Sequence, residues 1–325
     1  MSVIRSAIAG VGAYLPETIV TNDDLAAIVE TSDAWIQERT GIKERRRAAP
    51  DQPTSDLAVE AAKRALLAAG KEPADIDLIV VATTTPDMTF PATAAIVQRK
   101  LGAPICPAFD VQAVCSGFVY ALSVADGFVA RGLSRCAVVI GAEEMTRLMD
   151  WSDRSTCVLF GDGAGAVVLT PEEGQGTTAD RGLLGFALRC DGNKTDLLYV
   201  DGGPATTGTV GHLRMAGNQV FRHAVINIAE AVEGACKAAG LQVSEVDWFI
   251  PHQANQRIIK GVGDRLGIDE SKVVLTVDRH ANTSAASIPL ALDAAIADGR
   301  VKRGDLLLLE AMGGGLTWGA CAIRY

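Results

Sequence analysis

Cys115 lies in the segment FDVQAVCSGFVYAL, where an apolar strand is expected to turn into a helix. A free thiol is only about 3% ionised at neutral pH. The unpaired N–H groups and the dipole of a helix N-terminus would favour the thiolate. The segment is therefore typical of a nucleophilic cysteine, and a buried cysteine without a chemical role is the alternative.

Two further side chains could act with this thiol. His252 follows an apolar strand in FIPHQANQRIIKGVGDRLG, with Asn255 three residues later and an amphipathic helix beyond it. Asn282 lies in DRHANTSAASIPLALDAAI, at another expected strand-to-helix turn, where an asparagine also often serves as a cap or turn residue. A structural role is the default for the remaining histidines, His212, His223 and His280.

A run of glycines supplies a third kind of group. The segment EAMGGGLTWGA places three consecutive glycines, 313–315, directly after an apolar strand. Such a run exposes backbone N–H groups that could bind a developing oxyanion. A flexible turn without a chemical role is the alternative.

An internal repeat indicates how these segments are positioned. The segment EAAKRALLAAGKEPADID (60–77) matches EAVEGACKAAGLQVSEVD (230–247) at seven of eighteen positions. Similar segments follow both in the same order: LIVVATTTP and WFIPHQAN, FDVQAVCSG and VDRHANTSA, AVVIGAEEM and LLLLEAMGG, GAGAVVLT and WGACAIRY. In this alignment Asn282 lies within one position of the counterpart of Cys115. Both turns are therefore expected to meet near an approximate twofold axis, where ligand sites are common.

The repeat predicts an α/β protein with two similar halves, residues 1–172 carrying the cysteine and residues 173–325 carrying the histidine and asparagine. The strands are continuously apolar, as expected for central strands that helices cover on both faces. The helix in TSDLAVEAAKRALLAAG begins at a Thr/Ser/Asp cap and ends at Gly70.

Composition excludes several classes of protein. The formal net charge of −9 and the aromatic content of 5% argue against nucleic acid or an anionic membrane as a partner. No segment resembles a targeting signal or a membrane span. The seven cysteines show no CxxC spacing, so neither a disulfide framework nor a zinc site is indicated. A reduced, cytoplasmic protein without a bound metal is expected.

Together, these motifs resemble a known family. The segments AVCSGF, PHQAN, HANTSAAS and GGGLTWG are similar to the signature segments of β-ketoacyl-acyl-carrier-protein synthase III, a condensing enzyme of fatty-acid initiation. The similarity also includes TSDAWIQERTGIKERR, FGDGAGAVVL and GNQVF, so it runs the length of the chain. The resemblance implies a thiolase-like fold, with mixed sheets in a layered α-β-α-β-α arrangement.

The resemblance also implies an acyltransferase with a ping-pong mechanism and no resident cofactor. Cys115 would take a short acyl group, with acetyl expected, from acyl-coenzyme A, which is a substrate. Malonyl-acyl carrier protein would then lose CO2, with His252 and Asn282 donating hydrogen bonds to its thioester oxygen. The resulting carbanion would attack the acyl-cysteine to give 3-oxoacyl-carrier protein. Backbone N–H groups of Cys115 and Gly314 would form the oxyanion hole.

Further positions match the family's substrate contacts. The coenzyme A contacts would be Trp35 and Arg154 stacking on the adenine, Arg39 nearby, and Gly217 and Asn255 along the pantetheine arm. An exposed tryptophan beside arginine suits a nucleotide base, although Trp35 could simply anchor a helix.

Two positions match the family's acyl pocket. Phe90 corresponds to the residue that reaches across a homodimer to that pocket and limits chain length, which implies a dimer and short primers. Met312 stands where the family often has Phe, so the exact shape of the pocket stays open.

Docking of an acidic carrier protein on this acidic chain needs a local basic patch. The matching positions are Arg222, Arg257, Lys260 and Arg265, with Asp264 at a position that is often basic. An ordinary solvated face is the alternative.

Other classes of protein fit less well. A papain-like cysteine hydrolase also carries Cys, His and Asn in this order, but the CGSCW-type segment is missing. The Gly-rich segments GVGAYL and GDGAGA fail as dinucleotide-binding loops, because the first lacks the third glycine and the second leads into a strand. A degradative thiolase should carry a second catalytic cysteine in a CxGxG-like segment, whereas the corresponding stretch here is GGGLTWGACAIRY, with Cys321 in the expected strand beyond the glycines. A related condensing enzyme with a branched or longer primer, or of the quinolone or polyketide type, stays open.

Overall fold

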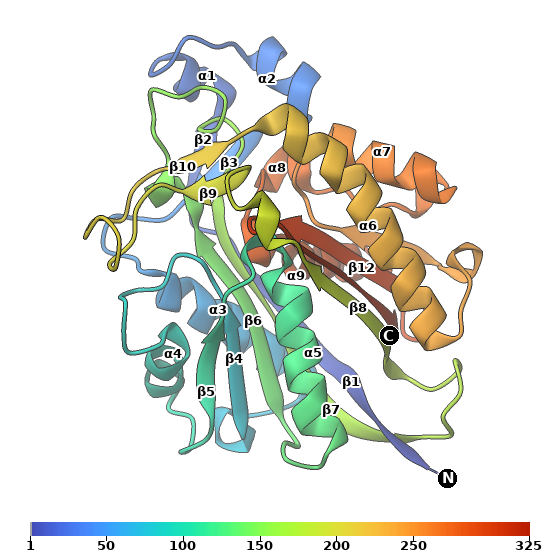
Figure 1. Ribbon diagram of the computed structural model, residues 1–325. Helices are drawn as coiled ribbons and strands as arrows, with labels where there is room; N and C mark the ends of the chain where they lie inside the picture. The colour runs from blue at the N-terminus through green and yellow to red at the C-terminus, as the bar shows by residue number, and fades with distance from the viewer. Residues whose placement is uncertain (1) are drawn as a thin grey trace.

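The computed structural model describes residues 2–325, which form two mixed β-sheets separated and covered by helices (Figure 1). The first sheet has the order β1 (Val3–Tyr14), β7 (Asp162–Gly174), β6 (Ala137–Glu144), β4 (Leu78–Ala82), β5 (Ala108–Val111). Strand β4 pairs in parallel with β5 and β6, whereas β7 is antiparallel to both β6 and β1.

The second sheet repeats this pattern. Its order is β11 (Trp248–Pro251), β12 (Leu306–Gly313), β13 (Thr317–Arg324), β8 (Gly182–Cys190). The pair β11 and β12 is parallel, and the other two pairs are antiparallel. The series β8-β13-β12-β11 therefore has the same pairing as β1-β7-β6-β4, and the prediction of two similar halves is confirmed. The predicted boundary at residues 172 and 173 falls within β7 and stays a prediction.

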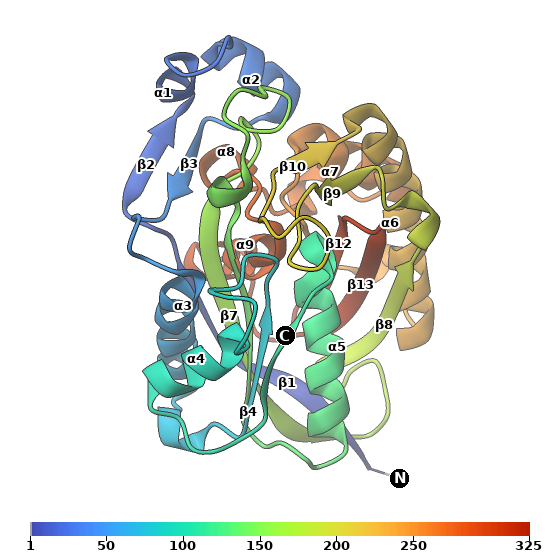
Figure 2. The ribbon, with the colours of Figure 1, turned by 60° about the vertical axis from the view of Figure 1, so that its left-hand side comes forward.

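Six helices complete the layers (Figures 1 and 2). Their bounds are α3 (Thr54–Ala69), α4 (Thr93–Leu101), α5 (Gly117–Ala130), α6 (Gly217–Ala239), α7 (Gln256–Leu266) and α9 (Ser287–Ala297). Helices α5 and α9 share one hydrophobic core with both sheets, and they are apolar over most of their surface because they form the central layer. Helices α3 and α4 cover the outer face of the first sheet, and α6 and α7 cover that of the second. The α-β-α-β-α arrangement is thus confirmed.

A smaller group of elements covers one end of these layers (Figure 2). It comprises β2 (Thr18–Thr21), α1 (Asn22–Ala26), α2 (Asp33–Thr40), β3 (Glu44–Arg47), β9 (Leu198–Val200), β10 (Leu213–Met215) and α8 (Val277–His280). Strands β2 and β3 form one antiparallel pair, and β9 and β10 form another. A separate hydrophobic cluster lies under these elements and includes Ile36, Met145 and Phe160.

Equivalent positions in the turns before α5 and α9 differ by 170 in residue number. Short 3₁₀ turns at Val114–Ser116 and Ser284–Ala286 precede α5 and α9, and the first residue of each turn has a positive φ, 50° and 49°. The structural counterpart of Cys115 is therefore Ala285, and Asn282 lies three residues earlier. The sequence alignment, which placed Asn282 within one position of that counterpart, is wrong because α8 occupies the place of β5.

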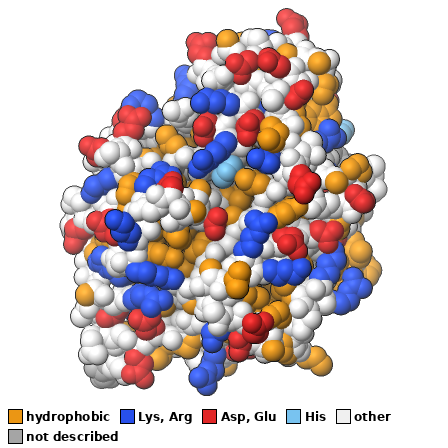
Figure 3. Space-filling view, turned by 180° about the vertical axis from the view of Figure 1, so that it is seen from behind, with side chains coloured by type: hydrophobic (Ala, Val, Ile, Leu, Met, Phe, Trp, Pro, Cys, Tyr) orange, Lys and Arg blue, Asp and Glu red, His pale blue; other side chains and the backbone are white. Residues whose placement is uncertain are grey.

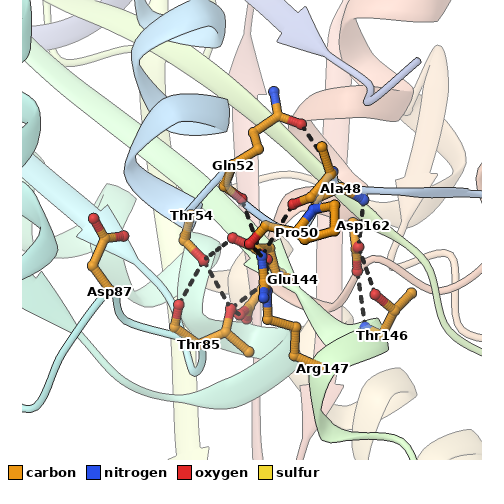
Figure 4. Close-up of polar contacts among 12 residues, drawn as sticks. Ala48, Pro50, Gln52, Thr54, Thr85, Asp87, Glu144, Thr146, Arg147 and Asp162 are labelled. Carbon is orange, nitrogen blue, oxygen red and sulfur yellow. Dashed lines mark hydrogen bonds and ion pairs between the residues drawn. The ribbon is translucent and has the colours of Figure 1, made fainter. Parts of the chain in front are cut away.

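A polar network fixes the ends of β6 and β7 against the segment before α3 (Figure 4). The buried Asp162 carboxylate accepts hydrogen bonds from Thr146 N (2.9 Å), Thr146 Oγ1 (2.7 Å) and Ala48 N (2.9 Å). Glu144 pairs with Arg147, which also donates to the carbonyls of Ala49 and Pro50. The network holds the turn Met145–Leu148, which borders the cavity described below.

The molecular surface carries charges of both signs. Figure 3 shows the face opposite that of Figure 1, where basic and acidic side chains lie interspersed. No helix in residues 2–325 is long and apolar enough to cross a membrane.

The close approach of the second 3₁₀ turn, Ser284–Ala286, to β6 generates a prediction about Gly141. A Cβ atom at this position would lie 2.3 Å from the carbonyl oxygen of Ala285, so Gly141→Ala must push the second turn away from β6. We expect the free energy of unfolding to fall by at least about 1–3 kcal/mol in urea denaturation.

The matched control is Gly127→Ala in α5, where a Cβ has no heavy atom within 4 Å. Alanine in an exposed helix position should raise the free energy of unfolding by about 0.5–1 kcal/mol. Equal stabilities for the two variants would contradict the packing described here.

Candidate active site

Cys115, His252 and Asn282 converge on one cavity of about 570 Å³. Cys115 comes from the turn before α5, His252 follows β11, and Asn282 follows α8. All three are buried, with less than a tenth of each residue exposed. The two turns meet as expected, since Gly117 and Ala285 approach each other beside the cavity. The prediction of a strand before Asn282 is wrong, because the second turn joins α8 to α9.

The burial of Cys115 opposes ionisation of its thiol. Burial raises the pKa of Cys115 to about 12, the nearby Ser284 hydroxyl lowers it, and the Glu143 carboxylate raises it further. The sequence predicted that the helix N-terminus would favour the thiolate. Burial outweighs that effect, so the thiol must lose its proton during attack on a substrate.

His252 is a neutral imidazole held on two sides. Its backbone N–H donates to the carbonyl of Glu310 at 2.8 Å, and its Nδ1 lies 2.6 Å from Ser287 Oγ. Burial lowers the pKa of His252 to about 3. A neutral imidazole carries a single N–H group, on either Nδ1 or Nε2, and can donate one hydrogen bond from it.

One end of the Asn282 side-chain amide stabilises the turn, and the other end is available to a ligand. Its Oδ1 accepts a hydrogen bond from Ser284 N at 2.9 Å, as a cap would. Its backbone is fixed by the Leu159 carbonyl and the Gly161 N–H. The amide Nδ2 is therefore the part of this side chain that can donate to a ligand.

The glycine run packs against the cysteine turn. A Cβ at Gly313 would lie 2.5 Å from Cys115 N, so only glycine permits this approach. Gly314 is buried against the carbonyl of Leu198 and is not part of the cavity lining in residues 2–325. Its part in an oxyanion hole stays a prediction.

The cavity opens between α2 and the start of α6 and α7. Trp35, Arg39, Gly217 and Asn255 line this mouth. Arg39 and Arg154 lie over the Trp35 ring, with guanidinium carbons 4.5 and 5.1 Å from its centroid. Asn255 Nδ2 donates to the carbonyl of Arg39 at 3.0 Å. The five predicted coenzyme A contacts therefore lie together, with Arg154 just outside the lining.

The other predicted contacts divide into two groups. Met312, Arg222 and Arg257 line the same cavity, whereas Lys260 and Arg265 lie exposed farther along α7. Phe90 is 81% exposed and lies away from the cavity lining within the described chain.

Three buried residues near the site were not found by sequence reasoning. Glu310 lines the cavity without a hydrogen-bond partner for Oε2, and burial raises its pKa to about 8. Glu143 accepts from Ser284 Oγ at 2.9 Å, and Ser287 contacts His252. A glutamate inside the apolar run LLLLEA was the one available signal. No cluster of metal-ligating side chains occurs among residues 2–325.

Comparisons with known proteins find similar proteins both in sequence and in structure. The family model described as 3-oxoacyl-[acyl-carrier-protein (ACP)] synthase III matches residues 109–192, and the model for its C-terminal part matches residues 236–325. A β-ketoacyl-[acyl-carrier-protein] synthase III of Caulobacter vibrioides is 75% identical over 321 residues, which cover 99% of this chain and 100% of the relative.

Two further proteins extend the comparison. A β-ketoacyl-[acyl-carrier-protein] synthase III of Rhodospirillum centenum is 62% identical over 322 residues, 99% of both chains. The crystal structure of 3-oxoacyl-[acyl-carrier-protein] synthase III from Aquifex aeolicus VF5 has a TM-score of 0.92 at 47% identity. This match covers 98% of the present chain and 100% of the other.

Proposed function

The chain belongs to the β-ketoacyl-acyl-carrier-protein synthase III family, and we propose that it condenses a short acyl-coenzyme A with malonyl-acyl carrier protein. The products are 3-oxoacyl-carrier protein, CO2 and coenzyme A, and the reaction initiates fatty-acid synthesis. The observation that carries this proposal is the convergence of Cys115, His252 and Asn282 on a cavity with an indole and arginines at its mouth.

The first half-reaction is an acyl transfer. Cys115 Sγ attacks the thioester carbonyl carbon, a new carbon–sulfur bond forms, and the bond to coenzyme A breaks. The thiol proton ends on the departing coenzyme A sulfur. The tetrahedral intermediate needs N–H donors at its oxyanion, a role that we assign to the backbones of Cys115 and Gly314.

The second half-reaction needs donors and no strong base. Loss of CO2 from the malonyl group leaves an enolate, whose oxygen takes hydrogen bonds from His252 Nε2 and Asn282 Nδ2. The carbanion then attacks the acyl-cysteine, and the Cys115 sulfur leaves and is reprotonated. The low pKa of His252 supports this assignment, because the imidazole stays neutral throughout the physiological pH range.

Coenzyme A would enter through the mouth of the cavity. Trp35 and Arg154 would stack on the adenine, with Arg39 beside them and Gly217 and Asn255 along the pantetheine arm. Arg154 lies 5.1 Å from the Trp35 centroid, so a base that stacks between them must displace the guanidinium. Arg154 is exposed and donates one hydrogen bond, to the carbonyl of Glu30, so this displacement costs little.

A homodimer would complete the acyl pocket, and acetyl is the primer that we expect. Strand β5 forms one edge of the first sheet, and Phe90 and Met88 are exposed hydrophobic side chains. An uncovered edge with exposed apolar groups favours association with a second copy. The partner's Phe90 would then shorten the pocket that Met312 borders. Analytical ultracentrifugation at micromolar concentration distinguishes this dimer from a monomer.

The carrier protein would dock beside the mouth of the cavity. Arg222 and Arg257 line the mouth, and Lys260 and Arg265 continue along the exposed face of α7. Asp264 lies 3.9 Å from Lys260 and offsets part of its charge. The patch is therefore positive but weaker than its count of basic residues indicates.

Product analysis tests the proposed reaction. Wild-type protein with acetyl-coenzyme A and malonyl-carrier protein should yield acetoacetyl-carrier protein by mass spectrometry. His252→Ala and Asn282→Ala should each slow release of CO2 by about 10²- to 10³-fold, because each removes one donor to the enolate. A wild-type protein that forms no 3-oxoacyl product with any short acyl-coenzyme A would refute the proposal.

Arg265→Glu tests carrier docking separately from acyl transfer, because Arg265 lies outside the cavity. We expect the KM for malonyl-carrier protein to rise about fivefold at low salt, equivalent to about 1 kcal/mol for a surface charge pair. The KM for acetyl-coenzyme A should not change. Arg131→Glu, with the same charge change at the far end of α5, is the control. Equal effects of both variants would contradict docking on α7.

A further inference from the structure

Within residues 2–325, Ser287 is the one side chain that contacts the ring of His252 by a hydrogen bond. Its Oγ lies 2.6 Å from His252 Nδ1, and both residues are buried. This contact by itself permits two arrangements, since either the hydroxyl or Nδ1 could carry the shared proton.

A second contact selects between these arrangements. The backbone N–H of Gln253 points to Ser287 Oγ at 3.3 Å, and an N–H can only donate. The Gln253 side chain is fixed in turn by Pro251, Val274, Thr276 and Val277. Among residues 2–325, His252 Nδ1 is the one hydrogen-bond acceptor within reach of the Ser287 hydroxyl proton, so the arrangement in which Ser287 accepts from Gln253 and donates to Nδ1 uses both its lone pair and its proton.

We propose that Ser287 is a positioning residue that makes His252 Nδ1 an acceptor and so places the ring proton on Nε2. The Nε2–H group is then the donor available to the cavity. The opposite tautomer would present a lone pair to the enolate oxygen and repel it. This proposal rests on the proposed function for its catalytic consequence, although the tautomer itself does not depend on the reaction.

A neutral partner also explains why the imidazole stays uncharged. A carboxylate beside Nδ1 would stabilise the imidazolium, as in sites where histidine acts as a base. A serine hydroxyl orients the ring without adding charge. Burial can therefore keep His252 neutral, which agrees with its lowered pKa.

Ser287 also connects the two donors of the site. Its backbone N–H donates to the carbonyl of Ser284, whose own N–H donates to Asn282 Oδ1. The turn that orients the Asn282 amide is thus continuous with the residue that orients His252. Movement of either donor would be transmitted to the other through this short segment.

The direct test is the ¹⁵N NMR spectrum of histidine-labelled wild-type protein, with the His252 signals assigned by their loss in His252→Asn. We expect a protonated Nε2 and an unprotonated Nδ1 at pH 7. Protonation at Nδ1 would overturn the proposal even if the protein is an active condensing enzyme. The expected tautomer in a protein that does not condense malonyl-carrier protein would leave the proposal standing and refute the proposed function.

The kinetic test uses Ser287→Ala, with Ser287→Thr as the variant that keeps the hydroxyl. Ser287→Ala should slow CO2 release from malonyl-carrier protein about 10- to 100-fold, as loss of a supporting hydrogen bond commonly does. Acetyl transfer to Cys115 should stay within about twofold, and Ser287→Thr should recover most of the lost rate. A structural role alone would slow both half-reactions together.

The control for loss of a buried hydroxyl is Ser6→Ala, because Ser6 Oγ donates to Asp126 far from the site. It should leave both half-reactions unchanged. If Ser287→Ala retains the wild-type rate of CO2 release and the wild-type tautomer, Ser287 does not position His252. If Ser287→Ala fails to fold, the wild-type spectrum alone decides the proposal.

Discussion

Direct backbone contact between the two halves is the constraint on which the site depends. The turn before α9 packs its Ala285 carbonyl against Gly141 of β6, and the turn before α5 packs the Cys115 backbone against Gly313 of β12. Each half thus supplies a strand glycine that receives the turn of the other half. No side chain separates these backbones, so the nucleophile and both donors lie within one small cavity. Insertion of a single methyl group would change their separation.

The same packing determines the electrostatics of the site. Burial raises the pKa of Cys115 and Glu310 and lowers that of His252, so for all three groups it favours the uncharged form. Neutral donors at the reacting centre stabilise charge where it develops, on an oxyanion or an enolate, without a permanent ion pair to separate first. The arginines that line the cavity lie at its mouth. This environment fits a reaction in which decarboxylation supplies the carbanion.

Sequence patterns predicted much of the fold, and the reasons for the failures are physical. Apolar runs such as LIVVA predict buried strands reliably, and glycines at 70 and 240 end helices in both halves with positive φ. The predicted alignment of the two turns was wrong by two residues, because identical residue types in two segments cannot reveal that a helix replaces a strand. The prediction that a helix N-terminus favours the Cys115 thiolate was wrong, because burial raises the pKa of this thiol and cannot be judged from its neighbours in sequence. Ser287 was missed because its partner His252 is 35 residues away. The family's motifs supplied the three catalytic candidates, whose roles stay predictions, as do those of Gly314 and Phe90.

Intact-mass analysis of Cys115 tests the central claim most directly, that one buried thiol carries the acyl group between two half-reactions. Wild type and Cys115→Ala are incubated with acetyl-coenzyme A, and the acyl-enzyme is then chased with malonyl-carrier protein. The account predicts an acetyl increment on wild type alone, mapped to Cys115 by peptide digestion and removed by the chase with release of CO2. Absence of an adduct from any short acyl-coenzyme A, or an equal adduct on Cys115→Ala, would contradict it.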